Sequence, residues 1–297
     1  MVSEGGIHIA LKGVTRIYPA HSGHGEVHAL GPIDLNIRRG EFFGIVGPSG
    51  CGKSTLLETL AGLVRPTAGT AIFEGKAIGA EVPEGIGVVF QEDAAFPWLT
   101  VERNVGFGLR HARVDSAEVA RRVDRAIDFM GLGAFRRAYP SQLSGGMRQR
   151  VCIARTLVTR PRLILLDEPF GALDQQTRLL MGEELLRLWR DTAATVVLIT
   201  HSLDEAAMLS DRVAVMSSRP GRFIAVLETN WPRDRDSRIV SEPGFGQLTS
   251  RLWTLLRDES RKALDAALRY PSSGAWRSSP ARCWRSNWPA ARASSIG

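Results

Sequence analysis

Apolar and polar residues alternate in two segments near the beginning of the chain. Residues 7–12 and 33–38 have Ile or Leu at every second position, with polar or small residues between them. Side chains along a strand point to opposite faces in turn, so this period predicts half-buried strands of an antiparallel sheet.

Five short runs elsewhere are largely apolar. They cover residues 42–46, 86–90, 163–166, 195–200 and 212–216. Continuous apolar runs of this length are typical of strands that are buried on both faces of a parallel sheet. All of them fall far short of the roughly 20 apolar residues that a membrane-spanning helix needs.

Helical spacing of apolar residues marks other parts of the chain. Residues 116–130 have Val, Ile and Met at this spacing with arginines between them, and residues 176–190 are also amphipathic. Residues from about 92 to 160 therefore suggest a helical insertion within an α/β domain. A further helix is predicted from Leu248 toward Leu268.

A glycine-rich turn separates the apolar run 42–46 from a helix-compatible segment. It matches the phosphate-binding pattern of Gly, four residues, Gly, Lys and Ser or Thr. Glycines let backbone N–H groups point at phosphate oxygens, and the following helix adds the positive end of its dipole. We expect Lys53 to face the β- and γ-phosphates and Ser54 to face Mg²⁺. A ligand-free turn is the alternative. The predicted nucleotide-binding residues of this turn are Gly47, Pro48, Ser49, Gly50, Cys51, Gly52, Lys53, Ser54 and Thr55.

A second helix start contains Leu-Ser-Gly-Gly at residues 143–146. Ser144 is suited to cap the helix, while Gly145 and Gly146 leave its first backbone N–H groups accessible to an anion. Taken alone, these four residues fit a simple cap-and-glycine turn equally well.

Acidic residues and a histidine follow two of the apolar runs. Asp167 ends the run 163–166, where it can hold Mg²⁺ through water, and Glu168 can orient or polarise an attacking water molecule. His201 follows another strand at its carboxyl end, where α/β proteins bind ligands. A purely structural histidine is the alternative.

Tyr18 is an aromatic residue upstream of the glycine-rich turn. Its ring could pack on the core, or it could be the platform on which an adenine ring stacks.

Positive charge is concentrated toward the end of the chain. The formal net charge is +7, and residues 271–297 contain Arg277, Arg282, Arg285 and Arg292 without any acidic residue. Outside this segment the charge is that of an ordinary solvated surface. Because the segment has no hydrophobic periodicity, we expect it to be disordered. It could bind an acidic surface or result from a shifted reading frame.

The spacing of the cysteines and the composition of residues 1–6 indicate the cellular compartment. Cys51, Cys152 and Cys283 have neither metal-binding nor disulfide-like spacing, which fits a reducing compartment. Residues 1–6 lack the basic start and apolar segment of a signal peptide. We therefore expect a cytoplasmic protein or a peripheral subunit on the cytoplasmic face of a membrane.

In their order and spacing, these motifs resemble the ATPase subunit of ATP-binding cassette (ABC) transporters over about residues 7–227. The resemblance implies an α/β fold of the P-loop NTPase class, with a parallel core sheet, an antiparallel β subdomain and a helical subdomain at about 92–160. Residues 228–270 would then be a C-terminal helical extension, and 271–297 a disordered basic tail.

The same resemblance implies that ATP and Mg²⁺ bind between the two subunits of a homodimer. Each ATP would meet the glycine-rich turn of one subunit and Ser144 with Gly146 of the other, so that hydrolysis requires closure. Glu168 would be the catalytic carboxylate, and Asp174 would link the two sites. The roles of the remaining residues follow the family pattern: Tyr18 stacks on adenine, Gln91 contacts Mg²⁺ and the attacking water, His201 steadies the γ-phosphate, and Ser54 and Asp167 hold Mg²⁺.

Two residues depart from the usual family pattern. Met147 stands where Gln is common, which changes little because Ser144 and Gly146 are expected to meet the phosphate. Gly171 replaces the Ser of many members and so removes one side-chain contact.

Finer detail is similar to the nitrate, sulfonate and taurine importer ATPases, in residues 88–105, 147–150, 170–174 and 218–222. In that group, residues 96–98 lie by the groove that receives a short cytoplasmic helix of the membrane permease; the alternative is that Phe96 and Trp98 pack within the helical insertion. The resemblance thus implies an ATPase that energises an importer of nitrate, sulfonate, taurine or a related small solute. It would be located on the cytoplasmic face of the inner membrane, with permease subunits as partners and a periplasmic or extracellular solute-binding protein as an indirect one.

A soluble ABC-type ATPase that acts on nucleic acid is the competing hypothesis, motivated by the basic charge. The chain lacks the long coiled coil of DNA-repair relatives and the second cassette of translation-factor relatives, so no specific nucleic acid is expected. A small-molecule kinase would leave residues 143–146 unexplained.

Overall fold

The chain divides into two compact units, residues 1–263 and 264–297. The computed structural model describes residues 6–19, 25–79, 82–91 and 94–269. The disorder expected for residues 271–297 concerns a segment outside these ranges and stays a prediction.

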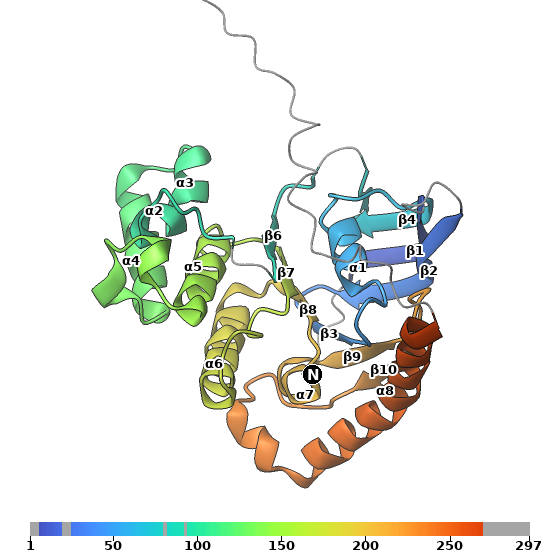
Figure 1. Ribbon diagram of the computed structural model, residues 1–297. Coiled ribbons are helices and arrows are strands. Elements are labelled where there is room, and N and C mark those ends of the chain that lie inside the picture. Colours follow the sequence, from blue (N-terminus) through green and yellow to red (C-terminus); the bar gives the residue numbers. More distant parts are fainter. Residues whose placement is uncertain (1–5, 20–24, 80–81, 92–93, 270–297) are drawn as a thin grey trace, which may run out of the picture. The chain divides into compact units, whose positions relative to one another are not determined.

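A six-stranded sheet in the order β10-β9-β3-β8-β7-β6 is the centre of the first unit (Figure 1). The apolar runs form its strands, and β3, β7 and β8 are buried along their whole length, as predicted. All neighbours are parallel except β10, which pairs antiparallel with β9. The strands are β3 (Phe42–Val46), β6 (Ile86–Val89), β7 (Leu163–Asp167), β8 (Thr195–Ile199), β9 (Arg212–Met216) and β10 (Phe223–Glu228).

A second, antiparallel sheet has the order β2-β1-β4-β5. Its strands are β1 (Ile7–Pro19), β2 (Glu26–Arg38), β4 (Ala68–Phe73) and β5 (Lys76–Ala77). In β2 the predicted alternation is confirmed, because Ile33, Leu35 and Ile37 are buried between exposed neighbours.

The beginning of β1 departs from the predicted alternation. Ile7 is 59% exposed, whereas His8 is buried. The His8 ring can be buried because both of its nitrogens have partners, Thr195 Oγ1 at 2.5 Å and Glu74 Oε1 at 3.1 Å.

The helices fall where the apolar spacing indicates, with shifted ends. The segment 116–130 forms α4 (Ser116–Phe129), and 176–190 forms α6 (Gln175–Thr192). The last helix begins at Pro243 instead of Leu248. This last helix is α8 (Pro243–Arg269), and the remaining helices are α1 (Lys53–Leu60), α2 (Val101–Val105), α3 (Phe107–His111), α5 (Gly145–Leu157) and α7 (Leu203–Leu209). Short 3₁₀ turns lie at Gly133–Phe135, Pro140–Gln142 and Ser237–Ser241. Within the described ranges, no helix is long and apolar enough to span a membrane.

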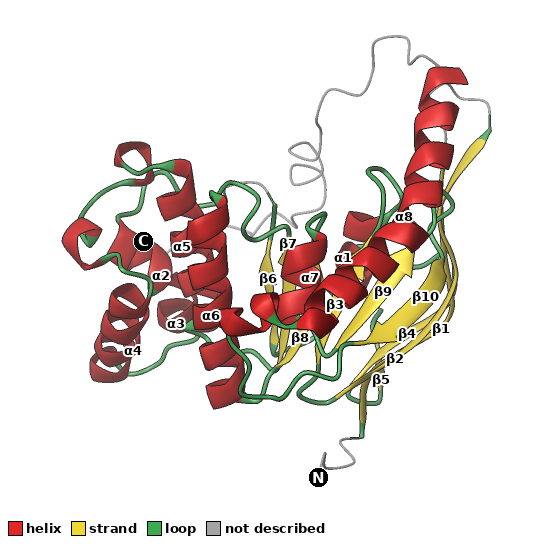
Figure 2. Ribbon diagram, turned by 90° about the horizontal axis from the view of Figure 1, so that it is seen from below, coloured by secondary structure: helices red, strands yellow, loops and turns green. Residues whose placement is uncertain are grey.

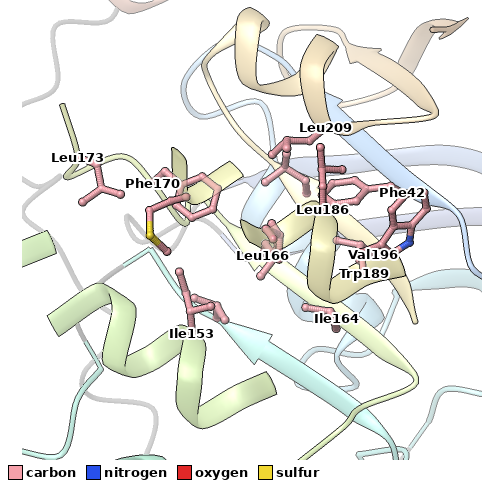
Figure 3. Close-up of a cluster of buried hydrophobic side chains, with 14 of the residues drawn as sticks. Phe42, Ile153, Ile164, Leu166, Phe170, Leu173, Leu186, Trp189, Val196 and Leu209 are labelled. Atoms are coloured by element: carbon pink, nitrogen blue, oxygen red, sulfur yellow. The ribbon is translucent and has the colours of Figure 1, made fainter. Parts of the chain in front are cut away.

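The two faces of the central sheet pack against different partners. One face meets α6, α7 and the helical region α2–α5, and the other meets α1 and the antiparallel sheet. Helices α5 and α1 accordingly lie on opposite sides of strands β6 and β7 (Figures 1 and 2). Figure 3 shows part of the first core, in which Phe42 and Trp189 meet edge to face at 5.7 Å between ring centroids.

The parallel strands also fix where chemistry can occur. Because β3, β6, β7 and β8 point the same way, their carboxyl ends open onto one edge of the sheet. Ligands of open α/β sheets bind outside this edge.

Candidate nucleotide site

The glycine-rich turn joins buried β3 to α1 at this edge. Gly52 caps α1 in the left-handed conformation, with φ 106°. A Cβ at Gly52 would lie 2.6 Å from the Ala29 carbonyl oxygen, and one at Gly47 would lie 2.9 Å from Cys51 Sγ. Glycine is therefore required by backbone conformation at Gly52 and by close packing at both positions.

The Lys53 side chain folds back onto the turn and is held there by two backbone carbonyl groups. Its ammonium donates hydrogen bonds to the carbonyl oxygens of Gly47 at 2.8 Å and Pro48 at 3.0 Å. The positive charge thus lies beside the first backbone N–H groups of α1, which makes the local field favourable for an anion. Ser49, Gly50 and Ser54 are exposed, and Thr55 is partly buried.

Asp167, the last residue of β7, is 6% exposed and lies beside the Ser54 hydroxyl. Burial raises the pKa of its carboxyl group, and the negative charge of Glu168 adds to this effect, while Ser54 and Lys53 oppose it. Two oxygen groups, one hydroxyl and one buried carboxylate, therefore meet at the start of α1.

Glu168, Gln91 and His201 converge on one point. Glu168 Oε2 lies 3.0 Å from Gln91 Nε2 and 3.1 Å from His201 Nδ1. The Gln91 amide donates a hydrogen bond to this oxygen, and the His201 ring lies beside it. The three residues follow β6, β7 and β8, which are adjacent strands. The sequence identified each residue separately, and the strand order brings them together.

Glu168 has an unusual backbone. Its φ is +47°, a left-handed value that is uncommon for a residue other than glycine. Hydrogen bonds hold this conformation, since Glu168 N–H donates to Ile199 O at 2.8 Å and Gly171 N–H donates to Glu168 O at 3.1 Å. The carboxylate is thereby fixed at the strand end.

Ser144 lies apart from these groups. It caps α5, and its Oγ accepts a hydrogen bond from Met147 N–H at 3.3 Å. Gly145 and Gly146 begin the helix, and a Cβ at Gly146 would lie 2.5 Å from Leu173 Cδ2. Helix α5 lies on the other side of β6 and β7 from α1, the helix that follows the glycine-rich turn (Figures 1 and 2).

Asp174 caps α6 in the same manner. It accepts hydrogen bonds from Thr177 N–H at 3.0 Å and from Thr177 Oγ1 at 2.6 Å, and these lower the pKa of its carboxyl group. The turn that contains Asp174 begins at Glu168, so the backbone connects Asp174 directly to the contact of Glu168 with Gln91 and His201.

Tyr18 is partly buried at the end of β1, where it pairs with Val27. The Arg16 guanidinium lies 4.3 Å from the centroid of its ring. The contact helps to fix the orientation of the ring.

Arg219 is a contact of this site that the sequence reasoning missed. Its Nε and Nη2 donate to the carbonyl oxygen of Gly50 at 3.2 and 3.0 Å. The residue lies in the segment 218–222, noted in the sequence only as a family match. The available signal was an arginine next to Pro-Gly in a loop between two predicted strands.

Glu205 is a second residue that the sequence did not single out. It is 6% exposed on α7, four residues after His201, and Thr200 Oγ1 donates to its Oε2 at 2.6 Å. Burial raises the pKa of its carboxyl group to about 7, and the neighbouring Arg178 opposes this change.

Phe96 and Trp98 form an aromatic pair in the segment that precedes α2. Phe96 and Trp98 stack at 5.5 Å between ring centroids, and Trp98 is 70% exposed. Phe96 also contacts Phe107 and the Arg155 guanidinium. Phe96 thus packs within the helical region, while Trp98 faces solvent; contact of this segment with a permease helix stays a prediction.

Comparison with known proteins identifies related chains. A family model described as "ABC transporter" matches residues 30–171. An uncharacterised ABC transporter ATP-binding protein of Methanocaldococcus jannaschii is 41% identical over 258 residues, which are 87% of this chain and 94% of that protein. The taurine import ATP-binding protein of Pelagibacter ubique is 47% identical over 197 residues, 66% of this chain and 74% of that protein. The nitrate import ATP-binding protein of Synechococcus elongatus is 42% identical over 243 residues, 80% of this chain but only 37% of that longer protein.

Solved structures agree with this relationship. The dimeric post-hydrolysis structure of an ATP-binding cassette bound to ADP and Pi is 32% identical, has a TM-score of 0.68, and is matched over 75% of this chain and 100% of that one. Together with the convergence of the glycine-rich turn, Asp167 and Glu168 at one sheet edge, these similarities show that the chain belongs to the ABC transporter family as an ATP-binding cassette ATPase.

Proposed function

We propose that this ATPase drives the import of a small solute, of the class that includes nitrate and taurine, through a membrane permease. The observation that carries the catalytic part is the contact of Glu168 with both Gln91 and His201 beside the glycine-rich turn. Support for import comes from relatives that are import ATP-binding proteins for taurine and nitrate. The nucleic-acid alternative has no support among the relatives reported above.

In the proposed mechanism, binding uses groups that are already arranged. Lys53 exchanges its hydrogen bonds to Gly47 and Pro48 for β- and γ-phosphate oxygens, while the N–H groups at the start of α1 hold the other oxygens. Tyr18 would stack on adenine, with the Arg16 guanidinium helping to orient its ring.

Mg²⁺ fits the oxygen donors at the edge of the sheet. The Ser54 hydroxyl and the Asp167 carboxyl group lie beside each other, and a nearby cation stabilises the charged form of this buried carboxylate. Ser54 and Asp167 would hold the ion, with Gln91 close to it. When bound, Mg²⁺ supplies neutralisation of the charge on the phosphate oxygens. Among the described residues, no group of three or more His, Cys, Asp or Glu side chains could hold a metal ion, so the proposed site uses Ser54 and Asp167 and leaves room for phosphate oxygens as further ligands.

Glu168 would orient the attacking water molecule. Gln91 donates to its Oε2 and His201 lies 3.1 Å from the same oxygen, so Oε1 would remain to accept a hydrogen bond from water. This positioning of a nucleophile is the main contribution that a protein can make to phosphoryl transfer.

A second copy would complete each site. The start of α5, with Ser144 and Gly146, offers backbone N–H groups to an anion, and α5 lies on the other side of β6 and β7 from α1. In a head-to-tail homodimer each α5 start would reach the ATP of the other copy, and Asp174 would lie between the two sites. A related cassette has a dimeric structure.

The membrane partner would bind the surface formed by Phe96 and Trp98. A stacked aromatic pair with one ring 70% exposed suits the apolar face of a short helix. The chain would thus be a peripheral subunit on the cytoplasmic side of the membrane, with a solute-binding protein as an indirect partner.

The test of the catalytic assignment is Glu168→Gln, compared with Glu184→Gln on the surface of α6 as a control. We expect kcat for ATP hydrolysis to fall by about 10²- to 10⁴-fold in the first variant and to stay unchanged in the second. Light scattering should detect an ATP-bound dimer of Glu168→Gln. A Glu168→Gln protein that hydrolyses ATP normally and remains monomeric would exclude the assigned role.

A further inference from the structure

The loop between β9 and β10, residues 217–222, lies against the glycine-rich turn. It is rigid because it is bonded to itself: Ser217 N–H donates to Arg222 O at 2.8 Å, and Ser217 Oγ donates to Pro220 O at 3.0 Å and accepts from Arg222 N–H at 3.0 Å. We call these residues the β9–β10 loop.

The first contact of this loop with the turn is made by Arg219, whose guanidinium donates two hydrogen bonds to the Gly50 carbonyl oxygen. In a trans peptide, the carbonyl of one residue and the N–H of the next point in opposite directions. By binding the Gly50 carbonyl, Arg219 holds this peptide plane, whose N–H, that of Cys51, donates to Pro48 O at 3.3 Å within the turn. The guanidinium also adds a positive charge next to the turn.

The second contact is through Gly221, which packs against the next peptide of the turn. A Cβ at Gly221 would lie 2.2 Å from Cys51 O and 2.6 Å from Met216 Cε. The Gly221 backbone is bonded on its other side to β2 and its bulge, since its N–H donates to Ala29 O at 3.1 Å and its carbonyl accepts from Gly31 N–H at 3.0 Å. Two consecutive carbonyls of the turn, those of Gly50 and Cys51, are therefore contacted by one loop.

The far side of the β9–β10 loop is held by α8, which runs beside β9 and β10 (Figures 1 and 2). Glu259 of this helix is 6% exposed, and its Oε2 accepts hydrogen bonds from Ser218 N–H at 2.7 Å and from Ser218 Oγ at 3.0 Å. Its Oε1 accepts from Lys262 Nζ at 2.6 Å. Burial acts to raise the pKa of Glu259, but the hydrogen bonds from Lys262 and Ser218 outweigh it and lower the pKa.

We propose that Glu259 is a positioning residue for the nucleotide site, acting through Ser218 and Arg219 to hold the glycine-rich turn in its phosphate-binding conformation. The C-terminal helix α8 is then part of the ATP-binding apparatus, although it lies outside the region that the family model matches. The proposal rests on ATP binding at this turn.

The physical basis is the free energy lost when the partly buried donors of Ser218 have no acceptor. Without the Glu259 carboxylate, Ser218 N–H and Oγ lose their acceptor in a half-buried position, and the β9–β10 loop must move to find water. Arg219 moves with it, because the two residues are adjacent in the chain. The turn then samples conformations in which its N–H groups do not converge, and ATP binds only the competent fraction.

The experiment compares steady-state ATPase kinetics of Arg219→Ala, Glu259→Ala and the double variant with the wild-type protein. Each single variant should raise KM for ATP about tenfold while kcat stays within about twofold, because binding geometry is lost and Glu168 is untouched. The double variant should raise KM no further than the worse single variant, since both act on one relay. Arg257→Ala, on the exposed surface of α8, is the matched control and should leave KM unchanged.

Two conservative variants separate positioning from folding. Glu259→Gln keeps an oxygen acceptor for Ser218 but loses the charge, so its KM should lie between those of the wild type and Glu259→Ala. If Glu259→Ala does not fold, Glu259→Gln carries the test: a KM equal to that of the wild type, at an unchanged melting temperature, overturns the proposal. The proposal is also overturned if the increase in KM of the double variant equals the product of the increases of the two single variants. Absence of ATPase activity in the wild-type chain would instead refute the proposed function.

Discussion

Replacing Glu205 by Gln should change the pH dependence of stability. Burial raises the pKa of this carboxyl from 4.5 to about 7 in the folded protein. Below about pH 4.5, Glu205 is protonated in both the folded and the unfolded chain. As the pH rises toward 7, the unfolded chain loses the proton first, so the folded state loses stability over this window.

The difference in pKa corresponds to about 3 kcal/mol, at about 1.4 kcal/mol for each unit. Glutamine has the shape of the acid but no charge, and its amide oxygen can still accept from Thr200 Oγ1. Its NH₂ group would occupy the position of Glu205 Oε1, which has no hydrogen-bond partner. That mismatch costs a further 1 to 3 kcal/mol, roughly, at every pH, so the slope with pH is the diagnostic quantity rather than the offset.

The assay is urea denaturation at several pH values between 5 and 8.5, with the wild type and Glu205→Gln measured side by side. Other groups also titrate here: the pKa of His8 is lowered by burial, which gives a slope of opposite sign. Both proteins share that slope, so the difference between their curves isolates Glu205. We expect the variant to gain about 2 to 3 kcal/mol relative to the wild type between pH 5 and pH 8.5, because part of the effect already develops below pH 5.

Asp204→Asn is the matched control, because Asp204 is exposed on the same helix. It should follow the wild-type curve at every pH. A difference between Glu205→Gln and the wild type that stays constant from pH 5 to 8.5 would show that Glu205 is ionised normally, and the reasoning from burial would be wrong.

Three further predictions concern the helical region and the end of the chain. Asn104→Ala should destabilise the fold by about 2 to 3 kcal/mol, because the buried amide bonds Phe96 N–H and the carbonyls of Phe96, Leu99 and Thr100; a smaller loss in chemical denaturation would count against this role. Trp98→Ala should leave stability within about 0.5 kcal/mol and the ATPase rate of the isolated chain unchanged, yet abolish transport in vesicles with the permease; intact transport would exclude the proposed docking surface. Deletion of residues 271–297 should leave kcat/KM within about twofold in the steady-state assay, and a larger loss would contradict the prediction of a dispensable tail.

Local features of the site could be predicted from the sequence because they are contiguous. The glycine-rich turn is a strand, a loop and a helix start within a short stretch, and its glycines are required by close backbone packing. The cap at Ser144 follows the same logic, since its side chain bonds a backbone N–H three residues later. The buried strands were recognisable because continuous apolar runs cannot be left in water.

The sequence was less informative where burial depended on a distant partner. The alternation in residues 7–12 predicted an exposed His8, but Thr195 and Glu74 satisfy its ring and allow it to be buried. Glu205 follows the same principle, because the packing of α7 against the sheet removes it from water. Hydrophobic period identifies a face of an element, and it does not identify what will cover that face.

The sequence by itself determined the elements, the phosphate-binding turn and the family pattern of its motifs. Only the tertiary structure decided which of these motifs touch. The order of β6, β7 and β8 brings Gln91 onto Glu168 across 77 positions, and the β9–β10 loop brings Arg219 onto Gly50 across 169. Strand order and loop docking are set by the packing of two cores and by the pairing of buried donors with acceptors. These contacts are long-range, so no local pattern in the chain records them.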